Sequence, residues 1–68
     1  MSTYLKMIEE AKKAAAASQY GDGSSHHGEW TVHVTEVRNP NSLKRHYRQQ
    51  WVCGGKNSTK AAAKEALS

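Results

Sequence analysis

The chain has 68 residues, with ten Lys or Arg against six Asp or Glu and a formal net charge of +4 at pH 7. So short a chain can form one small domain with a thin core, which excludes a second domain and argues against a deep substrate cavity. The excess of basic residues favours the binding of an anionic partner, such as nucleic acid, over a catalytic function. We therefore expect residues 1–68 to form a single binding domain that is not an enzyme and holds no cofactor.

Cysteine and histidine usage gives no sign of a metal site. Cys53 is the single cysteine, so no internal disulfide and no C-x-x-C pair can form. The histidines are His26, His27, His33 and His46, and they do not fall into a zinc-ligand spacing. One reduced cysteine fits an intracellular protein of the cytoplasm or nucleus. No apolar run is long enough to span a membrane, so no membrane partner is expected.

A helix is predicted for residues 3–18, which are dense in helix formers and contain neither Gly nor Pro. Ser2 or Thr3 can cap its start, and Gly21 ends it at the latest. Four apolar residues recur at helical spacing and define the expected buried face: Leu5, Ile8, Ala11 and Ala15.

A β-hairpin is predicted to follow. Residues 30–35 alternate apolar and polar side chains, which indicates a strand with Trp30, Val32 and Val34 facing inward. Residues 39–42 are typical of a turn, and a second strand is expected at roughly 43–53. The basic run 44–48 is interpreted as the solvated edge of that strand, because its aromatic residue, Tyr47, would face the helices.

The strand register follows from a tight turn centred on residues 40–41. It pairs Trp30 with Trp51, Val34 with Tyr47 and Glu36 with Arg45. A shift by one residue would bury charge opposite the core, so this register is preferred. It leaves Gln49 facing inward without a partner.

The last segment, Gly54–Leu67, reads as a turn that leads into a short alanine-rich helix with Ser58 as its N-cap. The free amides of a helix start and the helix dipole attract anions, and Lys56 and Lys60 flank this start. Lys64 follows Lys60 by one turn. The segment is therefore a candidate phosphate site, with an ordinary capped helix and solvated lysines as the alternative.

Three motifs in order resemble the double-stranded RNA-binding domain family. Residues 23–26, GSSH, are similar to the family's G-P-x-H, Trp30 follows His26 by four residues, and residues 58–64, STKAAAK, are similar to S-K-K-x-A-K. The resemblance implies an α+β fold of order α-β-β-β-α, with a three-stranded antiparallel sheet packed on one face by two helices. The first strand is expected to be short or to be drawn from residues 17–22.

Members of that family contact RNA through the first helix, the loop between the first two strands and the start of the second helix. By resemblance, the RNA-binding residues here are Lys60, Lys64, Lys56, His26, Ser25, Glu10 and Asn57. The implied function is non-catalytic binding of double-stranded RNA, reading A-form shape and phosphate backbone with little sequence specificity. No small-molecule substrate is expected.

The main alternative keeps this fold but changes the partner. Thr59 and Ala63 stand where the family pattern has lysines, and Ser24 stands where it has proline. These differences favour a protein–protein interaction or dimerisation module in which RNA binding is weak or lost.

Overall fold

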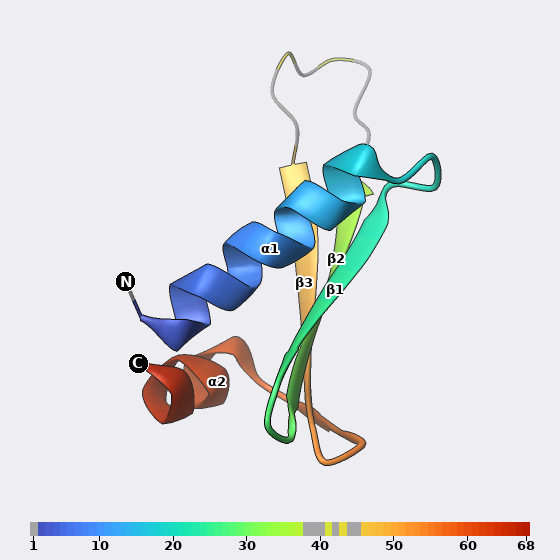
Figure 1. Ribbon diagram of the computed structural model, residues 1–68. Coiled ribbons are helices and arrows are strands. Elements are labelled where there is room, and N and C mark those ends of the chain that lie inside the picture. The colour runs from blue at the N-terminus through green and yellow to red at the C-terminus, as the bar shows by residue number, and fades with distance from the viewer. Residues whose placement is uncertain (1, 38–40, 42, 44–45) are drawn as a thin grey trace.

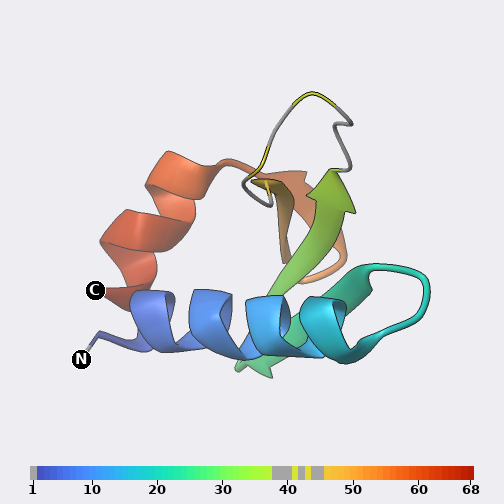
Figure 2. The ribbon, with the colours of Figure 1, turned by 90° about the horizontal axis from the view of Figure 1, so that it is seen from above.

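The computed structural model describes residues 2–37, 41, 43 and 46–68. Its elements are α1 (Thr3–Ala17), β1 (Asp22–His27), β2 (Trp30–Val37), β3 (His46–Cys53), β4 (Lys56–Ser58) and α2 (Lys60–Leu67). The strands form one antiparallel sheet in the order β1-β2-β3-β4. Helix α1 crosses one face of the sheet, and α2 lies beside the start of α1 (Figures 1 and 2). The α+β class and the pair of helices are confirmed.

The sheet has four strands, so the prediction of three was wrong. The extra strand is β4, which returns along β3 with Cys53 opposite Lys56 and Trp51 opposite Ser58. Gly54 and Gly55 make this return possible, because both have positive φ, at 57° and 82°. Residues expected to form a loop and a helix cap therefore extend the sheet.

Strand β1 contains Ser25 and His26, which the family resemblance placed in the loop between the first two strands. It pairs with β2 so that Ser25 lies opposite Val32 and His27 opposite Trp30. The connection between β1 and β2 is therefore a tight hairpin. Strand β1 is not short, and it is not formed by residues 17–22 as expected. The sequence DGSSHH is polar, so its strand conformation comes from pairing with β2 and from covering by α1 rather than from intrinsic propensity.

The hairpin of β2 and β3 keeps the predicted faces but not the predicted pairs. Val32 lies opposite Trp51, and Glu36 opposite Tyr47 instead of Arg45. This is a shift of two residues, which preserves the alternation of inward and outward side chains. Val32 and Val34 are accordingly fully buried, as predicted. The expected turn at 39–42 lies outside the described residues except for Asn41.

The core lies between the sheet and the helices. It consists of Tyr4, Met7, Ile8, Ala11, Ala15, Val32, Val34, Trp51 and Ala63. The Tyr4 ring stacks on Trp51 with centroids 5.3 Å apart, and Trp30 meets Trp51 edge-on at 6.3 Å. Leu5, expected inside, is 51% exposed, because the buried face of α1 is rotated toward Tyr4 and Met7.

The two helix starts show one confirmed cap and one correction. Ser2 caps α1, since its Oγ accepts from the amide of Leu5 at 3.3 Å. The cap of α2 is Thr59, not Ser58: Thr59 Oγ1 accepts from the amide of Ala62 at 3.1 Å. The strand pairing of Ser58 moves the helix start by one residue.

Candidate functional site

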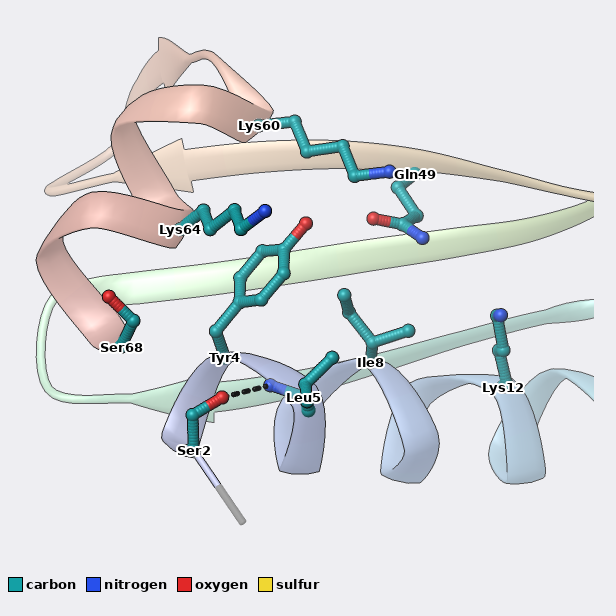
Figure 3. A pocket seen from close by; sticks show the side chains of 9 residues that line it. All are labelled: Ser2, Tyr4, Leu5, Ile8, Lys12, Gln49, Lys60, Lys64 and Ser68. Carbon is teal, nitrogen blue, oxygen red and sulfur yellow. Dashed lines mark hydrogen bonds between the residues drawn. The ribbon is translucent and has the colours of Figure 1, made fainter.

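A cleft of about 490 Å³ lies between α1 and α2 and reaches β3 (Figure 3). Its lining residues are Ser2, Tyr4, Leu5, Ile8, Lys12, Gln49, Lys60, Lys64 and Ser68. Three of them are lysines, and none of the described lining residues is Asp or Glu. The cleft is therefore a region of positive potential bounded by apolar side chains.

Helix packing brings the lysines together. On α2, Ala63 is fully buried against the core, and its small side chain allows a close approach of the helix. Lys60 and Lys64 are neighbours of Ala63 on the helix surface, one turn apart, and extend over the cleft (Figure 3). Lys12 comes from α1, with its Nζ 5.8 Å from the ring centroid of Tyr47. This cation–π contact places Lys12 at the far end of the cleft.

Tyr4 projects into the cleft from the first turn of α1. Its side chain is only 5% exposed, and its buried hydroxyl has no hydrogen-bond partner among the described residues. The hydroxyl points toward Lys60, Lys64 and Gln49 (Figure 3). Gln49, expected to lack a partner, accepts from Trp51 Nε1 at 3.3 Å through Oε1. Its amide nitrogen remains as the donor end.

Two of the residues predicted to bind RNA are bonded to each other away from this cleft. Ser25 Oγ donates to Glu10 Oε2 at 3.1 Å, and Ser25 is 6% exposed. Ser25 thus lies on β1 beneath α1 and not in an exposed loop. Its hydroxyl ties the sheet to the helix.

His26 and Asn57 lie on the sheet face opposite the helices, because they alternate with the inward-facing Ser25 and Ser58. His26 Nδ1 is 2.8 Å from Thr31 Oγ1, and Gln50 Nε2 donates to Asn57 Oδ1 at 3.2 Å. Both belong to one row across the sheet, and three strand spacings separate them by about 14 Å. His26 is on a strand, so its predicted loop position was wrong.

The predicted site residues therefore form three groups. Lys60 and Lys64 share the cleft, Glu10 and Ser25 share a hydrogen bond, and the rest lie at exposed positions of β1 and β4. Sequence reasoning missed Tyr4 and Lys12 as members of the cleft. Their spacing with Ile8, at four-residue intervals along α1, is the signal that could have grouped them.

Metal ligands do not gather within the described ranges, where no group of three or more His, Cys, Asp or Glu side chains is placed to hold an ion. Cys53 is a free, partly buried thiol. Neither helix is long and apolar enough to cross a membrane. Comparison of the chain with protein-family models, with curated proteins and with solved structures finds no match.

Proposed function

We propose that the chain is a non-catalytic module that binds double-stranded RNA through its phosphate backbone. The observation that carries the proposal is the convergence of Lys12, Lys60 and Lys64 from two helices on one cleft whose described lining has no Asp or Glu. An overall charge of +4 adds a favourable long-range field. Together these features favour a polyanion over a neutral partner.

Duplex RNA is the preferred polyanion for reasons of shape. An A-form helix presents a wide, shallow minor groove and rows of phosphates, which a rigid small domain can contact without reading bases. Lysines on successive turns of α2 can follow such a row, and Lys56 on β4 precedes the same helix. The motif order that resembles double-stranded RNA-binding domains supports the same choice.

A second candidate function is protein association by the same fold with weak RNA binding. The specific observation in its favour concerns the positions where the family pattern has lysines. Thr59 serves as the cap of α2, and Ala63 is fully buried, so neither position contributes charge. Leu5 also leaves an apolar side chain 51% exposed beside the cleft.

A titration with three nucleic acids at two salt concentrations tests both candidates. An RNA duplex, a DNA duplex of the same sequence and single-stranded RNA are each added, and the dissociation constants are compared. We expect preference for duplex RNA and an affinity that falls with salt. Equal affinity for both duplexes, or none for either, would refute RNA recognition. A sedimentation shift that persists at high salt would instead favour protein association.

Two lysine variants, compared per charge removed, identify the surface. The double change Lys60→Gln and Lys64→Gln should reduce the slope of log affinity against log salt by about 2, since each lost phosphate contact contributes about 1. Lys13→Gln is the control for a single charge, because Lys13 is exposed on α1 and does not line the cleft. If Lys13→Gln has as large an effect per charge, RNA binding does not centre on the cleft.

A further inference from the structure

Among the described residues that line the cleft, Tyr4 carries a buried polar atom that the folded chain leaves unpaired. Within the described residues it is buried and makes no hydrogen bond, although buried polar groups are normally paired because an unpaired one destabilises the fold. The stacking of the ring on Trp51 does not require it, since a phenylalanine would stack equally well. An unpartnered hydroxyl that points into a cleft indicates a missing ligand.

The polar groups around that hydroxyl define what the ligand must offer. Lysine ammonium groups only donate hydrogen bonds, and Gln49 has its oxygen engaged by Trp51, which leaves its amide nitrogen as a donor. The Tyr4 hydroxyl can donate as well. Donors therefore converge from Tyr4, Lys60 and Lys64, whereas the Gln49 amide nitrogen points away from the Tyr4 hydroxyl (Figure 3). A ligand that satisfies them presents several acceptors and negative charge.

Part of the remaining wall of the cleft is apolar. Leu5 and Ile8 line it beside the donors, and half of the Leu5 side chain is exposed there. A ligand that covers Leu5 would bury apolar surface that the folded chain leaves in water. From the donors and this wall together, we infer that the cleft binds a small organic anion, in which a phosphate or carboxylate group is joined to an apolar body.

This ligand goes beyond the proposed RNA binding and departs from the expectation of no small-molecule partner. The acidic group would lie against the Tyr4 hydroxyl and the two α2 ammonium groups, and the apolar body against Leu5 and Ile8. Lys60 and Lys64 are exposed, so their side chains can move aside to admit the anion. The sharing of these lysines also makes the anion a competitor of RNA.

Phenyl phosphate is a suitable probe because it joins both chemical features. We propose an amide NMR titration of the 68-residue chain with phenyl phosphate, inorganic phosphate and phenol in a phosphate-free buffer. Phenyl phosphate should bind at least about tenfold more tightly than either fragment and shift the amides of Leu5, Ile8 and Gln49. Benzoate in place of phenyl phosphate distinguishes a carboxylate from a phosphate preference.

Two tyrosine variants make the test specific. Tyr4→Phe keeps the ring and removes the donor, so affinity for phenyl phosphate should fall about tenfold, as expected for the loss of a hydrogen bond to a charged group. Tyr20→Phe is the matched control, because Tyr20 is 81% exposed and outside the cleft. The amide spectrum of each variant verifies that it is folded.

Three results would overturn the inference: unchanged affinity in Tyr4→Phe, no gain of phenyl phosphate over inorganic phosphate, or shifts centred on the opposite sheet face. RNA binding is measured on the same variant. Phenyl phosphate binding is measured on the chain without RNA, so its outcome does not depend on whether the chain binds duplex RNA. Loss of one activity without the other therefore separates this inference from the proposed function.

Discussion

The close approach of α1 to Gly23 on β1 predicts that Gly23→Ala is strongly destabilising. A Cβ atom at Gly23 would lie 2.5 Å from both the carbonyl oxygen of Ala11 and the amide nitrogen of Ala15, and 2.7 Å from Cβ of Ala14. The first two are backbone atoms of α1, which cannot rotate away as a side chain can. The substitution therefore has to move the helix or the strand.

The size of the effect follows from that displacement. Restoring an ordinary separation of about 3.4 Å requires α1 and β1 to move apart by nearly 1 Å, which loosens the contacts of Ala11 and Ala15 in a close-packed interior. Overpacking of this kind costs about 1–3 kcal/mol, and rigid backbone neighbours place Gly23→Ala at the upper end. The lower chain entropy of alanine returns about 0.5–1 kcal/mol. A net loss of about 2 kcal/mol is large for a domain whose core supplies about 3–5 kcal/mol.

Urea unfolding monitored by tryptophan fluorescence measures this loss, because Trp51 is 2% exposed in the folded state. Gly28→Ala is the control, because nothing lies within 4 Å of its added Cβ. Its loss of stability comes only from placing alanine at a φ of +61°, which costs about 1 kcal/mol. We expect the unfolding midpoint to fall further for Gly23→Ala than for Gly28→Ala. The opposite order would mean that α1 does not approach β1 as closely as described.

Two further predictions concern the helix cap and the tie between α1 and β1. Thr59→Ala should lower the free energy of unfolding by about 1 kcal/mol and Ser58→Ala by less, because Thr59 accepts the hydrogen bond at the start of α2. Thermal melts of both variants measure the two effects. A larger effect of Ser58→Ala would contradict Thr59 as the cap. Glu10→Ala and Ser25→Ala should show a coupling of about 0.5–1.5 kcal/mol in a double-mutant cycle, as one hydrogen bond contributes. Additive effects would mean that the bond does not stabilise the fold.

The sequence was informative where local pattern and burial agree. Helix α1 was predicted nearly to the residue, because residues 3–17 contain no helix breaker and Ser2 supplies a cap. In the hairpin, alternation determined which side chains face the core, but not which residues pair. Val34 is buried in either register, since a shift of two residues keeps its face. The hydrophobic pattern therefore determines which face of the sheet each side chain lies on. It does not determine which residues of β2 and β3 lie opposite each other.

Strands β1 and β4 could not be found from their own residues. Neither DGSSHH nor KNS has the apolar alternation of a half-buried strand. Both lie at the edges of the sheet, where the backbone of β2 or β3 supplies the pairing. Their conformation is thus a property of the assembled sheet, and the same holds for the Ser25 side chain, which the family resemblance placed in the loop between the first two strands.

The departures from the RNA-binding pattern also have a structural explanation that sequence could not supply. Position 59 holds the cap of α2, and position 63 is the point where this helix meets the core with 0% exposure. A lysine at position 63 would have to bury its stem there or push α2 outward. Positive charge is instead carried by Lys60 and Lys64, which border the buried alanine and face α1 across the cleft. The same packing that disfavours a lysine at position 63 therefore creates the concave, donor-rich site that contains the Tyr4 hydroxyl.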